Sequence, residues 1–306
     1  MYDKILKLLK RIYRKITRPA VLRKIKVSGE KEPRLADPEN HKILKELSGN
    51  DAEIFAEMRD LNKDLFRGFE PGNKVLIKIN INTADEYPAS TDPELLCNLI
   101  DCLKNIGISD IEVGDCSAYT RLPSRGVMKK TPLYDAVKNS ARIRFFDEEK
   151  WFKVHINGEY LKKITLPEAV FKADKIIYLS NLKTHRLADF SFGMKLAVGF
   201  MHPKERLELH KENLQEKIAE IMLAIEPDVI IIDARKCFVT GGPDCGDTAQ
   251  GHSVIVGNDL LETDLKAYNV LCEIKKENDC MQQFKDDPFE MRQFKHARKV
   301  LKGNNQ

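Results

Sequence analysis

Lysine and histidine side chains gather in one stretch of the chain, between residues 180 and 210. This stretch contains three of the seven histidines together with three lysines, namely His185, His202, His210, Lys183, Lys195 and Lys204. Imidazole exchanges protons near neutral pH and binds metals, and a lysine amine can hold an anion or react with a carbonyl group. We therefore expect a site here, in which His185, Lys195 and His210 transfer protons, bind a metal or hold an anionic ligand.

Lys195 is placed unusually, because it lies within the apolar segment at residues 192–200. An unpaired ammonium group is costly in apolar surroundings. Such a lysine needs a carboxylate or a ligand as its partner, or it has a lowered pKa that suits covalent chemistry. We expect Lys195 to hold a ligand or a cofactor, and Lys183 to add positive charge beside it.

Polar side chains also stand at or just after the ends of short apolar runs that have the composition of buried strands. They are Lys78, Asn80 and Asn82 at the run 74–79, Asp115 and Ser117 after 111–113, the stretch 180–210 after 175–179, and Asp233 after 229–232. In a parallel sheet these ends share one edge, where ligands bind. We expect Asp115 and Asp233 to orient the groups of the site; the alternative is that strand-end Asp and Asn residues only cap turns and helices.

A glycine-rich turn at residues 241–246 adds a second type of candidate group. Gly241, Gly242 and Gly246 would let backbone N–H groups approach a phosphate or carboxylate closely. The turn has neither the Walker pattern nor the GxGxxG pattern, so a plain loop is the alternative. We expect these three glycines to contribute to cofactor binding.

The elements that must position these residues alternate between strands and helices. Helices are predicted over residues 92–107 and 214–225 and after Asn258 or Asp259, whereas residues 42–67 are expected to form one or two helices. Residues 180–210 show no sustained helical or strand period and are expected to form a long functional loop. The fold class is therefore α/β, with largely parallel sheets, flanking helices and a ligand cleft at the C-terminal ends of the strands.

Composition limits the classes of function. The 306 residues carry a net charge of +4, but residues 1–26 hold ten Lys/Arg against one Asp, so the rest of the chain is acidic and nucleic-acid binding is not expected. Seven scattered cysteines without a CxxC motif indicate reduced thiols, a cytoplasmic location and no iron–sulfur cluster in this chain. No apolar run is long enough to span a membrane.

The N-terminal arm has its own pattern. Residues 4–17 predict a basic amphipathic helix, and residues 28–41 a polar linker, so the chain divides into an arm at 1–41 and an α/β body at 42–306, with one lobe or two. Residues 1–26 would contact a membrane surface peripherally or dock to a protein partner. The alternative is a helix packed on the body with a solvated basic face.

The sequence resembles the family called domain of unknown function 362. The matching residues run in family order over about residues 70–271: Lys78-Ile79-Asn80, Thr91-Asp92-Pro93-Glu94, Gly114-Asp115, Leu182-Lys183-Thr184-His185, Met194-Lys195-Leu196-Ala197-Val198-Gly199, His210, Ile232-Asp233, Gly242-Pro243 with Gly246, and Asp259 with Asp264. Family members often carry an iron–sulfur insert, whose cysteines this chain lacks. Asp92 stands where the family usually has a histidine. The resemblance implies the fold and the place of the site rather than an activity.

A more distant similarity is to the nickel-pincer lactate racemases. It rests on His185, on a Phe-Ser-x-Gly-x-Lys segment that ends at Lys195, and on His210. It implies a nickel-pincer-like cofactor tethered to Lys195, with His185 as acid and base and His210 or His185 as a metal ligand.

Two functional hypotheses follow. The first is an enzyme-like protein that binds a small anionic ligand or a lysine-tethered cofactor and is isomerase-like, racemase-like or redox-associated. The second is a non-catalytic accessory or scaffold protein of a redox system that docks through its N-terminal helix.

Overall fold

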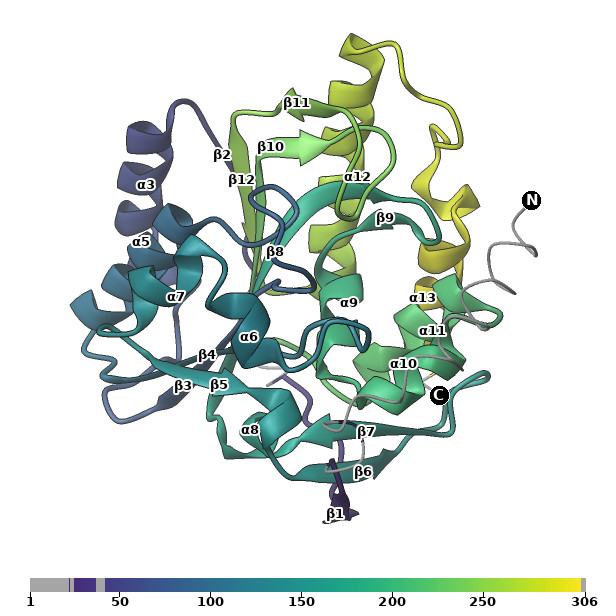
Figure 1. Cartoon of the computed structure of the whole chain (residues 1–306). Helices are drawn as coiled ribbons and strands as arrows, with labels where there is room; N and C mark the ends of the chain where they lie inside the picture. The colour runs from purple at the N-terminus through teal and green to yellow at the C-terminus, as the bar shows by residue number, and fades with distance from the viewer. Residues whose placement is uncertain (1–21, 23–24, 37–41, 304–306) are drawn as a thin grey trace.

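The structure is a computed structural model that describes residues 22, 25–36 and 42–303. A nine-stranded sheet runs through the middle of the molecule (Figure 1). Its strands, in spatial order, are β2 (Leu44–Ser48), β12 (Ser253–Gly257), β10 (Val229–Phe238), β8 (Lys175–His185), β3 (Lys74–Lys78), β4 (Asp110–Asp115) and β5 (Arg142–Phe145). Two short strands extend it, β9 (Asp189–Ser191) on β8 and β11 (Thr248–Gln250) on β10.

The five strands β10, β8, β3, β4 and β5 are parallel neighbours, whereas β12, β9 and β11 pair antiparallel to them. The chain passes from β3 to β4 and β5 on one side, and then returns to build β8 and β10 on the other side of β3. The order therefore reverses between β3 and β8, which is where open α/β sheets bind ligands. The predicted α/β class with a largely parallel sheet is confirmed.

Both faces of the sheet are buried, because successive apolar side chains of its strands point to opposite sides. Leu76, Ile176 and Ile230 belong to one core cluster, and their neighbours Ile77, Ile177 and Ile231 belong to the other. The near-continuous apolar runs in the sequence arise from this double burial.

Helices cover the two faces (Figure 1). On one face lie α3 (Asp51–Asp60), α4 (Asn62–Leu65), α5 (Pro93–Asn105), α6 (Ser124–Met128) and α7 (Pro132–Val137). On the other lie α8 (Glu168–Lys172), α9 (Gly193–Leu196), α10 (Pro203–Leu209), α11 (Leu214–Glu220), α12 (Leu260–Glu277) and α13 (Arg292–Gly303). Single 3₁₀ turns are η1 (Phe146–Glu148), η2 (Ala197–Phe200), η3 (Ile221–Leu223) and η4 (Pro288–Glu290). None of the helices in the described part of the chain is long and apolar enough to cross a bilayer.

The long stretch after the strand at 175–179 differs from the sequence-based expectation. It is not a loop: β8 continues to His185, and β9, α9, η2 and α10 follow in short succession. The elements after β8 are too short to show a period, and β8 is buried on both faces, so its residues do not alternate between apolar and exposed polar types. Similarly, β10 runs to Phe238 rather than ending at Ile232, and residues 44–48 form a strand before the predicted helices begin.

A small second sheet lies beside the main one and consists of β1 (Val27–Glu30), β6 (Trp151–His155) and β7 (Lys163–Pro167). Residues 28–41 were expected to be a linker, but β1 pairs with β6, and Arg34 forms an ion pair with the buried Asp228 at 2.6 Å. The basic helix predicted over residues 4–17 lies outside the described residues, so its contact with a membrane or a partner stays a prediction. The division at residue 41 stays a prediction as well.

Candidate functional site

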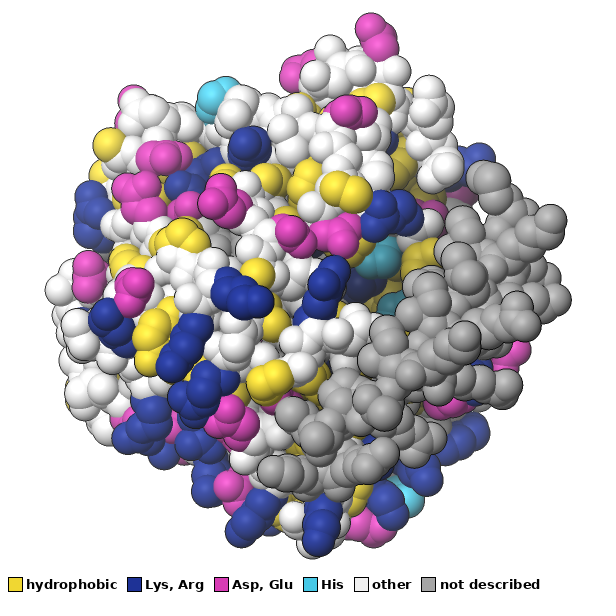
Figure 2. Space-filling view, in the orientation of Figure 1, with side chains coloured by type: hydrophobic (Ala, Val, Ile, Leu, Met, Phe, Trp, Pro, Cys, Tyr) yellow, Lys and Arg dark blue, Asp and Glu magenta, His cyan; other side chains and the backbone are white. Residues whose placement is uncertain are grey.

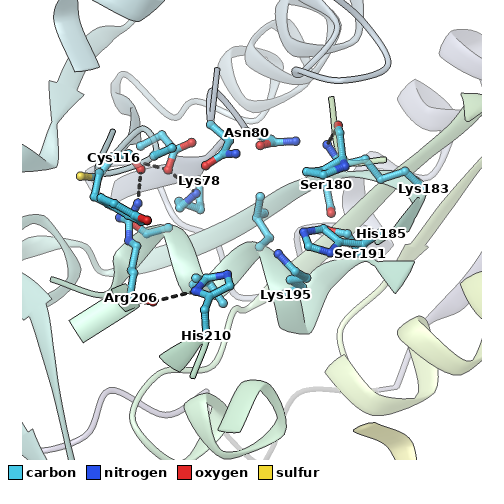
Figure 3. A pocket seen from close by; sticks show the side chains of 18 residues that line it. Lys78, Asn80, Cys116, Ser180, Lys183, His185, Ser191, Lys195, Arg206 and His210 are labelled. Atoms are coloured by element: carbon cyan, nitrogen blue, oxygen red, sulfur yellow. Dashed lines mark hydrogen bonds and ion pairs between the residues drawn. The ribbon is translucent and has the colours of Figure 1, made fainter. Parts of the chain in front are cut away.

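A cavity of about 170 Å³ opens at the C-terminal ends of β3, β4 and β8, at the point where the strand order reverses. Figure 3 shows side chains from separate elements around it, with Lys195 between His185 and His210 in this view. Histidine and Lys or Arg side chains also lie close together near the middle of the face shown in Figure 2. The residues that line the cavity include Lys78, Asn80, Asp115, Ser180, Lys183, His185, Ser191, Lys195, Gly199, Arg206 and His210.

Lys78 and Asp115 form a buried ion pair on one wall, with 2.7 Å between Nζ and Oδ1. Lys78 also donates to the carbonyl of Ile79, and Asp115 accepts from the backbone N–H groups of Ile81 and Cys116. Burial lowers the pKa of Lys78, and the neighbouring Asp115 opposes this shift. The two opposite charges of this pair therefore offset each other, and its hydrogen bonds to backbone groups fix the chain just after β3 and β4.

Arg206, on α10, is buried and donates only to backbone carbonyl groups. Its guanidinium contacts the carbonyl oxygens of Met201 at 2.9 Å, Cys116 at 2.6 Å and Ser117 at 3.0 Å, and that of Gly199. It thereby joins the segment after β4 to the turn η2. None of the carboxylates among the described residues forms an ion pair with Arg206, so these residues leave its positive charge without a counter-ion.

Lys183, on β8, is 3% exposed and is held by two carbonyl oxygens, those of Ala89 at 2.7 Å and Pro243 at 3.4 Å. Burial, together with the nearby charge of Lys195, lowers the pKa of Lys183 to about 7. Lys183 therefore donates to two carbonyl oxygens, which leaves one N–H group for a ligand, and its charge has no close counter-ion among the described residues.

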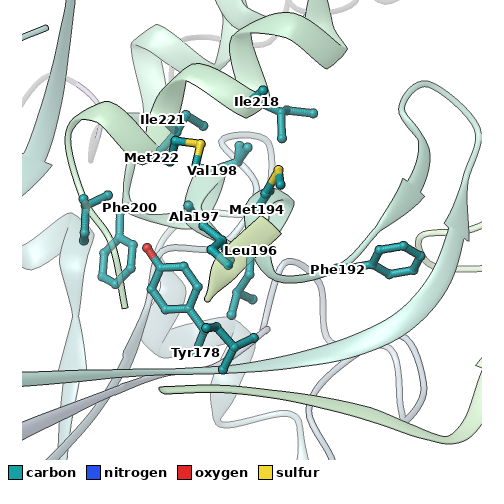
Figure 4. Close-up of a cluster of buried hydrophobic side chains, with 14 of the residues drawn as sticks. Tyr178, Phe192, Met194, Leu196, Ala197, Val198, Phe200, Ile218, Ile221 and Met222 are labelled. Carbon is teal, nitrogen blue, oxygen red and sulfur yellow. The ribbon is translucent and has the colours of Figure 1, made fainter. Parts of the chain in front are cut away.

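Lys195 is positioned by the short helix α9. Met194 and Leu196 on either side of it are buried against β8 and the α11–η3 region, as Figure 4 shows. The buried carboxylate of Asp264, on α12, accepts the backbone N–H groups of Gly193 at 2.8 Å and Met194 at 2.9 Å. A side chain at Gly193 would overlap Asp264, so glycine permits this close approach.

The amine of Lys195 has no hydrogen bond or ion pair with any residue in the described part of the chain. It faces the cavity, where burial and the nearby Arg206 lower its pKa to about 8. Of the two alternatives stated for this lysine, a carboxylate partner is absent among the described residues, and the role of Lys195 in holding a ligand stays a prediction.

His185 and His210 line the cavity with opposite tautomers. Nδ1 of His185 accepts from the backbone N–H groups of Leu187 and Ala188, so in the neutral ring Nε2 carries the proton. Nδ1 of His210 contacts the carbonyl of Arg206 at 2.6 Å, and a carbonyl only accepts, so Nδ1 carries the proton and Nε2 has a free lone pair. Burial lowers the pKa of both rings, which keeps them neutral at pH 7.

These tautomers limit the chemistry of each ring. His185 can donate a hydrogen bond to a ligand through Nε2, but it has no free lone pair for a metal or a proton. His210 has the arrangement that metal-binding and general-base histidines use, with the other ring nitrogen bonded to a carbonyl. The third histidine of the stretch, His202, caps α10 and packs against Trp151 outside the cavity. No group of three or more His, Cys, Asp or Glu residues within the described ranges is placed to hold a metal ion.

Asp233 is not brought to the cavity. Because β10 continues past it, its side chain pairs with Arg235 at 2.7 Å and accepts from the Tyr87 hydroxyl. Arg235 also contacts Asp92, the N-cap residue of α5. This cluster connects β10 to the start of α5. The side chain of Asp233 therefore contacts other protein groups and does not line the cavity.

The glycine turn contributes one lining residue, Pro243. Gly241, Gly242 and Gly246 have positive φ values, and a side chain on Gly242 or Gly246 would collide with the backbone carbonyl of Thr184 or Thr240. The N–H group of Gly242 donates to the carbonyl of Cys245, so it does not point at a ligand. Tight backbone packing accounts for these glycines, and the geometry gives no support to an anion cradle.

Reasoning from the sequence missed Arg206, Ser180 and Ser191. Arg206 follows a proline within a charged helix and resembles an ordinary surface residue in the sequence. Its partners are backbone carbonyl groups, which leave no mark on the residue types of the chain. Ser180 and Ser191 were hidden because the expected loop is really a strand pair, β8 with β9.

Comparison with protein-family models agrees with the resemblance to the domain of unknown function 362. The chain matches the family model described as domain of unknown function (DUF362) over residues 75–269. Among solved structures, it is similar to the crystal structure of a protein from Thermotoga maritima, with a TM-score of 0.47 and 16% identity, covering 76% of this chain and 60% of that chain. It is also similar to the lactate racemase apoprotein from Thermoanaerobacterium thermosaccharolyticum, with a TM-score of 0.41 and 13% identity, covering 81% of this chain and 58% of that chain.

The chain spans less than two thirds of the length of either of these two proteins. No curated protein was found to match it. Because the family model covers well over half of the 306 residues, the chain belongs to the family called domain of unknown function (DUF362).

Proposed function

We propose that the cavity binds a small organic anion and that Lys195 is the group that holds it. The observation that carries this proposal is the unpaired amine of Lys195, which faces a cavity with three more cationic side chains, Lys78, Lys183 and Arg206. Asp115 is the carboxylate in this lining, and it is already paired with Lys78. An anionic ligand would supply the counter-charge that the described residues lack.

The two histidines support proton transfer to and from such a ligand. The free lone pair on Nε2 of His210 accepts a proton from the ligand, and Nε2–H of His185 donates a hydrogen bond to a ligand oxygen, where it stabilises developing negative charge. His210 is therefore the proposed general base, and His185 is the proposed hydrogen-bond donor. The reaction class that fits is isomerisation or racemisation at a carbon next to a carboxylate.

A proton-exchange measurement tests this role of His210. We expect the protein in D₂O to exchange C–H protons of pyruvate or L-lactate more than about tenfold faster than the variant His210→Phe, which lacks the lone pair. Proton NMR follows the loss of signal. His202→Phe is the matched control, because His202 lies outside the cavity. Equal exchange rates in the protein and in the His210 variant would contradict the assignment.

The side chains also fit a group attached covalently through Lys195, because the amine is free of partners among the described residues and His210 offers one metal ligand. A metal-bearing group held there would supply Lewis-acid chemistry. Native mass spectrometry of the protein from its own host would reveal the added mass, and peptide mapping would show whether Lys195 carries it.

Anion binding should depend on pH through Lys195. Burial lowers the pKa of this amine to about 8, so the charged form is lost as the pH rises through that value. We expect the affinity for small carboxylates to be steady below about pH 7 and to fall above about pH 8. If binding requires one proton to be taken up by the amine, the affinity should fall by up to about tenfold per pH unit. Isothermal titration calorimetry across this range measures the change.

The variant Lys195→Arg provides the control for this pH profile, because a guanidinium stays charged throughout the range. In this variant, the affinity for small carboxylates should fall less above about pH 8 than it does in the unaltered protein. If the affinity of the unaltered protein stayed constant to about pH 10, the ammonium form of Lys195 would not be what holds the anion.

A further inference from the structure

The positive charge on the walls of the cavity is larger than one bound carboxylate can neutralise. Arg206 donates to four carbonyl oxygens, Lys183 donates to two, and Lys195 has no partner within the described ranges. Carbonyl oxygens satisfy N–H groups but carry no net charge. Asp115 is occupied by Lys78, and together with Asp244 it acts on Lys183 only from a distance.

Lys195 also experiences repulsion within this group, from Arg206, and exerts it on Lys183. The charge of Lys195 disfavours the charged form of Lys183, and that of Arg206 disfavours the charged form of Lys195. In a partly buried site such repulsion is screened less than at the surface, so it is relieved most by a ligand with a matching number of negative charges. Lys183 comes from β8 and Lys195 from α9, and the two amines lie apart on the cavity wall (Figure 3).

From this arrangement we infer that the natural ligand is a small dianion whose two negative charges are shared between Lys183 and Lys195. The inference rests on the proposed anion-binding function and names its substrate class. The cavity of about 170 Å³ is similar in size to an engineered protein cavity of about 150 Å³ that binds benzene. The buried part of the ligand therefore has only a few carbon atoms, as in a short dicarboxylate or a phosphate ester of a small alcohol.

Calorimetric titrations at constant ionic strength and pH 7 test this inference with five probes. Acetate and L-lactate are monoanions, malonate is a dicarboxylate of similar size, inorganic phosphate represents the phosphate esters, and malonamide is the neutral control. We expect malonate, phosphate or both to bind at least about tenfold more tightly than either monoanion, which corresponds to about 1.4 kcal/mol. Tighter binding of malonate would indicate that the natural ligand is a dicarboxylate, and tighter binding of phosphate would indicate a phosphate ester.

Variants of Lys183 locate the second charge. Lys183→Met should remove the preference for the dianion while retaining weak binding of lactate, and Lys183→Arg should keep the preference because its charge persists. Thermal unfolding of both variants shows whether they are folded. Since part of Lys183 is neutral at pH 7, dianion binding should also take up protons, which appears as a dependence of the binding heat on the ionisation heat of the buffer.

The possible results separate the two proposals. If malonate and phosphate bind no more tightly than lactate, or if folded Lys183→Met keeps the dianion preference, the dianion inference is wrong, whereas lactate binding that depends on Lys195 would still support the proposed function. If none of the five probes binds to the full chain, the anion-binding function itself fails.

Discussion

Replacing Lys195 with methionine is expected to abolish anion binding and to leave the thermal unfolding temperature nearly unchanged. The amine makes no hydrogen bond or ion pair within the described residues, so its removal breaks no contact that stabilises the fold. Methionine keeps an unbranched apolar stem beside the buried Met194 and Leu196. The loss of affinity should exceed about a hundredfold, because the substitution removes the unpaired cation that faces the ligand.

Calorimetry with lactate and malonate measures the affinity, and differential scanning calorimetry measures the unfolding temperature. Lys204→Met is the matched control, because Lys204 lies in the same stretch of sequence but is exposed and outside the cavity. That control should bind anions as the unaltered protein does. A large loss of stability in Lys195→Met with binding retained would show that the lysine has a structural role and would remove the main support for the site.

Some residues of the site could be predicted because local sequence features mark their positions. Lys78 and Asp115 stand at the ends of short apolar runs, and parallel strands place those ends at one edge, so their convergence follows from the fold class. Lys195 could be recognised because a lysine among large apolar residues is rare without a function. His185 and His210 were found because histidines are scarce in this chain, but the tautomers that divide their roles depend on backbone groups that the sequence does not specify.

The errors share a physical origin as well. Asp233 was assigned to the site on the assumption that β10 ends where its apolar run ends, but the strand continues through Arg235, whose charge is satisfied by Asp233 and Asp92. Strand length is decided by pairing with β8 and β11 and not by hydrophobicity alone. Arg206 was also missed because of tertiary contacts, since two of its carbonyl partners, Cys116 and Ser117, lie about ninety residues earlier in the chain.

The charge arrangement gives the buried pair of Lys78 and Asp115 a particular importance. Of the cations that line the cavity, Lys78 is the one with a carboxylate partner, and that carboxylate also holds the backbone at Ile81 and Cys116. The glycine at position 199 leaves room for the pair, because a side chain there would overlap both charged groups. The pair therefore sets one wall of the cavity, while Lys183 and Lys195 remain available to a ligand.

Asp115→Ala is accordingly expected to lower the free energy of unfolding by about 3–5 kcal/mol, the range found when one partner of a buried ion pair is removed. The substitution leaves Lys78, which is 1% exposed, without a counter-ion and deprives two backbone N–H groups of their acceptor. Urea unfolding followed by circular dichroism measures the change. The matched control is Asp110→Ala, on the same strand, whose carboxylate is more exposed and pairs with Lys74 near the surface, so its loss should cost less than about 1 kcal/mol.

A second variant separates the charge from the hydrogen bonds. In Lys78→Met/Asp115→Asn the buried charges are both gone, while the asparagine oxygen can still accept from a backbone N–H group, so most of the lost stability should return. If Asp115→Ala instead unfolded at the same urea concentration as the unaltered protein, the pair of Lys78 and Asp115 would not stabilise the fold, and its role in fixing this wall of the cavity would be wrong.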